Sequence, residues 1–160
     1  MMFYHKGIKS NLVFCSEAIS LLYKIIDVIY DHFDITNSFP EFEIILHPNY
    51  YKDKNESPET RKGYIMLSTD CENGIYVYYQ QIAWQFSHEL VHVCKGFIEK
   101  REEWIYLPDN DEEEILAGGI AILIVNNLCP TYDYKKKYSK SNLEQCEEKA
   151  KEIKELIIIR

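Results

Sequence analysis

The segment that most constrains the fold covers residues 80–96, where two histidines lie four positions apart between uncharged neighbours. The residues flanking these histidines are Trp84, Gln85, Phe86, Ser87, Leu90, Val91 and Val93. A helix on the surface would carry more charge at such positions. The segment therefore predicts a buried helix over 80–96, with Gly96 as its stop.

The same segment contains the pattern His88-Glu89-Leu90-Val91-His92. Residues four apart lie one helical turn above one another, so both imidazoles face the same way and can share one ion. Glu89 lies about 100° around the helix from His88, close enough to reach a metal-bound water but poorly placed to coordinate beside both histidines. Two neutral imidazoles with a nearby proton-accepting carboxylate suit zinc-assisted hydrolysis. We therefore expect His88 and His92 to bind Zn²⁺ and Glu89 to act as the general base.

A zinc ion that keeps one position open for water needs a third protein ligand. No histidine follows His92, so the sequence requires a carboxylate. The candidates in the next stretch of chain are Asp109, Asp111, Glu112, Glu113 and Glu114.

Glu114 is the favoured third ligand because of the residues on its face of the next predicted helix. Ala117, Gly118 and Ala121 follow it at helical spacing, and these small residues would let the two helices approach closely. Glu113 is the alternative, although its helix face would bring a bulkier contact. We expect Glu112 to do no more than favour the helix start.

The whole chain, residues 1–160, predicts a single domain of α+β class. Apolar periodicity and end signals predict helices at 16–31, 80–96, 111–127 and about 142–158. Runs rich in β-branched and aromatic residues predict strands at about 41–47, 64–69 and 75–79, in a small, mostly antiparallel meander. We expect a loop at 48–63 and N-caps at Ser16 and Ser141.

Composition excludes some functions. The net charge is −8 and no basic stripe is present, which argues against nucleic-acid binding. The five cysteines never occur as CxxC, which argues against a disulfide framework and suits a reducing compartment. No segment resembles a signal peptide or reaches the length of a membrane span. We therefore expect a cytoplasmic protein without a membrane partner; its oligomeric state stays open.

The pattern HELVH, followed some twenty residues later by Glu-x-x-Ala, resembles the gluzincin branch of the zincin metallopeptidases. The resemblance covers about residues 40–128, and the chain is similar in size to minimal gluzincins and to ImmA/IrrE-type domains, which usually have glycine where this chain has Val91. It implies a zinc peptidase acting on a peptide or protein substrate, which would pair with an edge strand at 75–79. It also implies an oxyanion-stabilising donor, for which Tyr106 and Tyr132 are candidates.

Two other functions are compatible with the sequence. One is a regulatory binding module that keeps the zincin-like fold without turnover. The other is a helical interaction protein in which the HExxH pattern is accidental. Zinc content separates the last function from the other two, because only an accidental pattern predicts a protein without bound metal.

Overall fold

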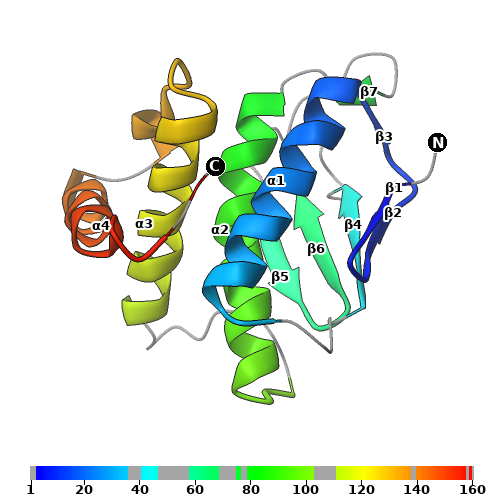
Figure 1. The fold of residues 1–160 in the computed structure, drawn as a ribbon, viewed down its shortest axis with the longest axis horizontal. Helices are drawn as coiled ribbons and strands as arrows, with labels where there is room; N and C mark the ends of the chain where they lie inside the picture. Colours follow the sequence, from blue (N-terminus) through cyan, green and yellow to red (C-terminus); the bar gives the residue numbers. More distant parts are fainter. Residues whose placement is uncertain are drawn as a thin grey trace.

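The computed structural model of the protein describes residues 3–35, 41–46, 58–68, 75–76, 79–102, 111–137, 140–157 and 159. The helices are α1 (Ser16–His32), α2 (Tyr79–Ile98), α3 (Asp111–Leu128) and α4 (Lys140–Ile153), with a 3₁₀ turn at Tyr134–Lys137. The strands are β1 (Phe3–His5), β2 (Ile8–Ser10), β3 (Val13–Phe14), β4 (Phe42–Leu46), β5 (Glu59–Arg61), β6 (Tyr64–Leu67) and β7 (Ile75–Tyr76). Helix α2 lies between α1 and the larger sheet on one side and α3 on the other, with α4 outermost (Figure 1). The predicted α+β class is confirmed.

The larger sheet has the strand order β1-β2-β4-β6-β5 and is mixed. Strand β4 pairs in parallel with both β2 and β6, whereas β1 with β2 and β5 with β6 form antiparallel pairs. The predicted antiparallel meander is therefore wrong. The first two strands of that predicted meander, β4 and β6, are parallel because β5 lies between them in the chain and runs antiparallel to β6, on its far side. Helix α1 forms the crossover between the other parallel pair, β2 and β4.

Short strands account for the other errors. Strand β5 lies inside the predicted loop at 48–63 and joins β6 through a tight turn at Lys62-Gly63, where Gly63 has φ +95°. Of the strand expected at 75–79, the structure describes β7 at Ile75–Tyr76, which pairs with β3 in a separate two-stranded sheet. Residues 77–78 lie outside the described residues, and Tyr79 begins α2. Strands β1 to β3 were not predicted, since each is too short to display alternation.

The helix ends differ from the expected ones at several positions. Helix α1 begins at Ser16 itself, with Cys15 in the cap position and no side-chain cap bond. Helix α4 begins at Lys140 and ends at Ile153, so Ser141 lies within its first turn and is not the N-cap. Helix α2 continues past Gly96 to Ile98.

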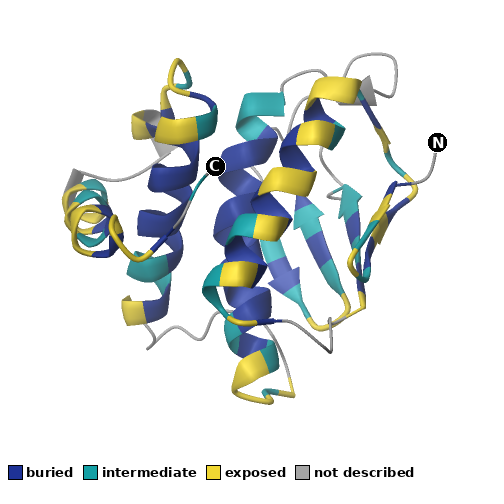
Figure 2. Cartoon of the chain, viewed as in Figure 1, coloured by how far each residue is buried: buried dark blue, intermediate teal, exposed yellow. Residues whose placement is uncertain are grey.

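The two central helices are buried on all faces. Every residue of 82–94 in α2 and of 117–125 in α3 is buried, which confirms the prediction of a buried helix around the two histidines (Figure 2). Helix α3 also approaches α4 closely, because a Cβ atom at Gly119 would lie 3.2 Å from the backbone nitrogen of Ala150. Within the described residues, no helix is long and apolar enough to cross a membrane.

Candidate metal centre

Three side chains from the adjacent helices α2 and α3 converge at one point. The Nε2 atom of His88 lies 2.7 Å from Oε1 of Glu114, and Nε2 of His92 lies 3.1 Å from Oε2 of the same carboxylate. The three potential ligand atoms all lie within 4.8 Å of one another. The structure therefore brings together the three residues that the sequence predicts as metal ligands.

The donor set fits a divalent cation with one position left for water. Two imidazole nitrogens and one carboxylate oxygen are ligands that zinc accepts, with bonds of about 2.0–2.2 Å. Tetrahedral bonds of that length separate neighbouring ligand atoms by about 3.4 Å. The distances of 2.7 and 3.1 Å between Glu114 and the two histidines are hydrogen-bond lengths, so these two contacts would lengthen by about 0.3–0.7 Å around an ion.

The ionisation of this group reflects the contacts between its members. Burial opposes charge on His92, but hydrogen bonds to Glu113 and Glu114 outweigh it and raise the pKa of the imidazole to about 9. Burial likewise opposes charge on Glu114, yet hydrogen bonds from His88 and His92 hold the pKa of its carboxyl well below the usual range. The carboxylate of Glu114 is therefore negatively charged, and a bound cation would lie between it and the two imidazoles.

Glu113, the alternative ligand, contacts His92 from the other side of the ring. Its Oε2 lies 2.6 Å from Nδ1 of His92, and its side chain is 1% exposed. A ligating histidine commonly donates its second ring N–H to a carboxylate, which fixes the ring and leaves the other nitrogen free. Glu113 is therefore placed to orient the ring of His92, and this contact was not predicted from the sequence.

The other acids considered as ligands are not part of the converging group or lie outside the described residues. Glu112 is exposed at the start of α3, and Asp111 is exposed and lines the same pocket as His88 and Glu114. Asp109 lies outside the described residues, as does the tyrosine candidate Tyr106. Among the described acids, only Glu114 is grouped with both histidines.

Glu89 is buried and contacts the sheet, and its charge is among the causes that raise the pKa of His92. The hydroxyl of Thr60, in β5, donates a hydrogen bond of 2.5 Å to Oε2 of Glu89. The same hydroxyl lies 3.2 Å from the main-chain oxygen of Glu89. The sequence analysis did not single out Thr60, because a contact across 29 residues has no local signal.

Among the described strands, β5 contacts Glu89 through Thr60, whereas β7, the described part of the predicted strand at 75–79, belongs to the separate two-stranded sheet. Strand β5 ends the order of the larger sheet and packs against α2. The side chain of Gln85 attaches α2 to the neighbouring strand, because it bonds both the main-chain nitrogen and the main-chain oxygen of Ser68, at 3.0 and 2.8 Å. These two hydrogen bonds fix the position of α2 relative to the end of β6.

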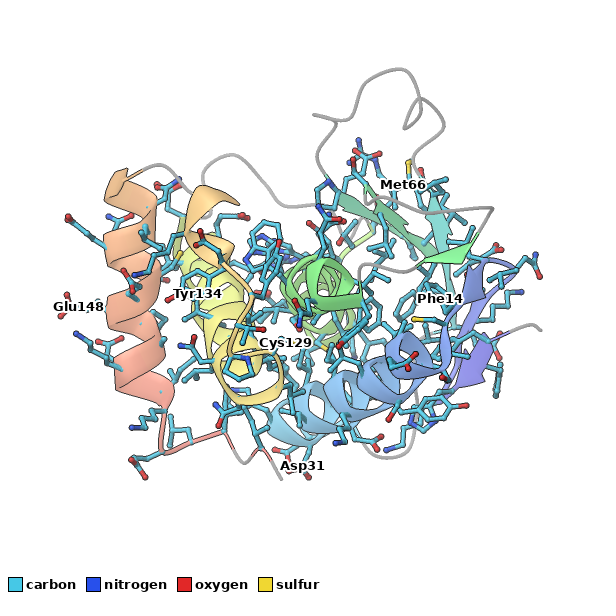
Figure 3. All side chains as sticks on the ribbon, turned by 90° about the horizontal axis from the view of Figure 1, so that it is seen from above. Phe14, Asp31, Met66, Cys129, Tyr134 and Glu148 are labelled. Carbon is cyan, nitrogen blue, oxygen red and sulfur yellow. The ribbon has the colours of Figure 1, made fainter. Side chains whose placement is uncertain are left out.

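One side of the ligand cluster opens into a pocket of about 360 Å³ between α2, α3 and α4. The lining residues are His88, Asp111, Glu114, Ile115, Asn142, Gln145 and Cys146. Seen from above, α2 has α3 and then α4 on one side and the sheet with α1 on the other (Figure 3). The pocket gives the half-exposed Glu114 its access to solvent.

Tyr132 does not border this cluster. It follows the end of α3, about 20 Å along the helix axis from Glu114. Its neighbour Thr131 is 3.4 Å from the side chain of Gln80, at the start of α2. Burial raises the pKa of Tyr132 to about 12. Its role as an oxyanion donor stays a prediction that this distance does not favour.

Comparisons of the chain with protein-family models, with curated proteins and with solved structures found no match. Function is therefore inferred from the residues and geometry of the site.

Proposed function

We propose that this chain is a zinc-dependent endopeptidase that holds its ion with His88, His92 and Glu114. The observation that carries the proposal is the convergence of these three donors within 4.8 Å. They come from helices whose remaining buried residues are largely apolar. When bound, zinc acts as a Lewis acid and lowers the pKa of a water ligand to about 7.

The energetics of burial support a functional site. Placing polar groups in an apolar interior costs free energy unless each finds a partner. Helix α2 nevertheless buries His88, Glu89 and His92, although apolar residues of similar size would pack there without that cost. Among the described residues, Nδ1 of His88 has no hydrogen-bond partner, so the arrangement is not optimised for stability alone.

The chain's own residues can supply the proton transfers of hydrolysis. Glu89 accepts the proton of the attacking water and returns it to the leaving amine. The hydroxyl of Thr60 occupies one oxygen of the Glu89 carboxylate and leaves the other available. Among the described strands β5 ends the order of the larger sheet, and an extended peptide can add to such an edge through main-chain hydrogen bonds, which gives affinity with little dependence on sequence.

Charge and cysteine state agree with a peptide substrate in a reducing compartment. The net charge of −8 disfavours nucleic acid and suits a neutral or basic peptide. The described cysteines Cys15, Cys94, Cys129 and Cys146 are all free, which is typical of cytoplasmic proteins. We propose the cytoplasm as the location on this basis.

Metal analysis of protein purified without chelator tests the proposal. We expect close to one zinc per chain in the parent, and less than about 0.2 would refute both the peptidase and a zinc-bound binding module. A trapping experiment separates these two functions. Glu89→Gln should retain zinc and capture a partner that the parent cleaves, whereas a binding module would leave that partner intact.

A further inference from the structure

We propose that Arg101 is a positioning residue of the metal centre, which holds Glu113 in the orientation that fixes the ring of His92. The inference rests on the proposed metal site but concerns a residue outside its ligands. Arg101 follows α2, and among the described residues its ion pairs are with Glu99 and Glu113, neither of which is a proposed ligand. Its effect on the ion would pass through Glu113.

The contact between Arg101 and Glu113 is a two-point ion pair. Nη1 of Arg101 lies 3.1 Å from Oε2 of Glu113, and Nη2 lies 2.6 Å from Oε1. Two parallel N–H···O bonds from a planar guanidinium restrict the rotation of a carboxylate as well as attract it. The carboxylate of Glu113 is therefore held in one plane.

The restrained carboxylate contacts His92 through one of these same oxygens. Oε2 of Glu113 receives the bond from Arg101 and also lies 2.6 Å from Nδ1 of His92. The side chains of Glu113 and His92 are 1% and 2% exposed, so water does not compete for this contact. Fixing Glu113 thus fixes the direction of the Nδ1–H bond and keeps Nε2 of His92 directed at Glu114.

The end of α2 explains why Arg101 reaches this position. Lys100 adopts φ 55°, and the chain reverses there with bonds from Lys100 N to Phe97 O (3.2 Å) and from Arg101 N to Gly96 O (2.9 Å). This pair of bonds is a Schellman ending, which turns the residue after the helix back along it. The same helix therefore carries His92 and, beyond its end, the residue that orients the partner of His92.

A purely structural role for Arg101 makes a different prediction. A buried carboxylate without a counter-charge is costly, and a purely structural Arg101 would do no more than neutralise Glu113. In that case its loss would lower the thermal stability and leave the zinc affinity of the folded protein unchanged. A positioning role requires a change in zinc affinity that depends on Glu113.

The test is the zinc affinity of the full chain, measured by competition with a chromophoric chelator. We expect Arg101→Met to weaken zinc binding by about 5–10-fold, near or below the range for direct partners of ligating histidines. Arg101→Lys, which keeps the charge but loses the two-point geometry, should fall between Arg101→Met and the parent. Lys100→Met is the control, since it removes the same charge at an exposed neighbouring residue and should change the affinity less than about 2-fold.

A double-mutant cycle then assigns the effect to Glu113. On a Glu113→Gln background, Arg101→Met should cause little further loss of zinc affinity. An equal loss on both backgrounds would overturn the proposal, as would an Arg101→Met affinity equal to that of the parent. If Arg101→Met fails to fold, the zinc affinity of Arg101→Lys is compared with and without Glu113→Gln in the same way. A parent that binds no zinc would instead refute the proposed function itself.

Discussion

Two neighbouring glutamates of α3 illustrate how a difference of one residue separates roles in this site. Glu114 is half exposed and bridges the Nε2 atoms of both histidines, whereas Glu113 is buried and contacts Nδ1 of His92. Successive helical residues differ by about 100° in direction, so the two carboxylates reach His92 from different sides. From the sequence, Glu113 and Glu114 were alternatives for one ligand position, whereas in the structure they contact different nitrogens of His92.

The first prediction concerns these acids. Glu114→Gln should weaken zinc binding by about one to two orders of magnitude, because it removes the only charged ligand of the proposed site. Glu112→Gln is the control, since Glu112 is exposed at the helix start and should leave the affinity nearly unchanged. Titration of each variant with a competing chelator measures the effect. A larger loss in Glu113→Gln than in Glu114→Gln would show that the ligand assignment is wrong.

The second prediction concerns Thr60. Thr60→Val keeps the side-chain shape but removes the hydroxyl that donates to Glu89. We expect peptidase activity to fall by about 10-fold, because the base loses the bond that orients it. Zinc affinity should not change, since the described contacts of the Thr60 hydroxyl are with Glu89, which is not a proposed ligand. Thr60→Ser retains the hydroxyl and should keep most of the activity; equal loss in both variants would contradict an orienting role.

At the scale of elements, periodicity predicted the helices well and the sheet poorly. Helices α1 and α3 begin at the predicted residue and end within one residue of the expected position, because their apolar patterns extend over several turns. Strand pairing depends on contacts between distant segments, so neither the parallel partners of β4 nor the place of β5 could be predicted locally. The candidate site shows the same contrast between local patterns, which the sequence reveals, and contacts between distant segments, which it does not.

Local spacing was enough to identify His88, Glu89 and His92, because the HExxH pattern lies within one helix. Glu114 was favoured by the small residues on its helix face, and the structure groups it with both histidines. The contacts of Thr60 and Arg101 are set by the β5–β6 hairpin and by the end of α2. Neither has a periodic signal, so only the folded chain reveals them.

The third prediction concerns the packing of α3 against α4. Gly119→Leu should destabilise the protein by about 1–3 kcal/mol, because even a Cβ at this position would meet the backbone of Ala150 at 3.2 Å. Thermal or denaturant unfolding measures the change. Lys151→Leu, at an exposed position of α4, is the matched control and should stay within about 0.5 kcal/mol of the parent. Equal stability of Gly119→Leu and the parent would contradict the close approach.

At the scale of the whole molecule, the proposed ion would join α2, which packs on the sheet, to α3, which carries α4. An ion that binds only the folded chain stabilises it in proportion to its occupancy. The metal centre would therefore couple the two sides of the fold as well as perform chemistry.

The fourth prediction follows from this coupling. Zinc at 100 times its dissociation constant should stabilise the fold by about 2.7 kcal/mol and raise Tm by several degrees. A chelator should reverse the shift, and His92→Ala should abolish it. The measurement is thermal unfolding with and without zinc. An identical zinc-dependent shift in His92→Ala would indicate that the ion binds elsewhere.

The central claim is that this zinc site hydrolyses peptide bonds with Glu89 as the base. Its most direct test is a proteome-wide comparison of new peptide termini after incubation with the zinc-loaded parent and with Glu89→Gln, with the zinc content of both proteins measured. We expect equal zinc in the two proteins and new termini with the parent alone. Equal zinc with the same set of termini in both samples would contradict the claim.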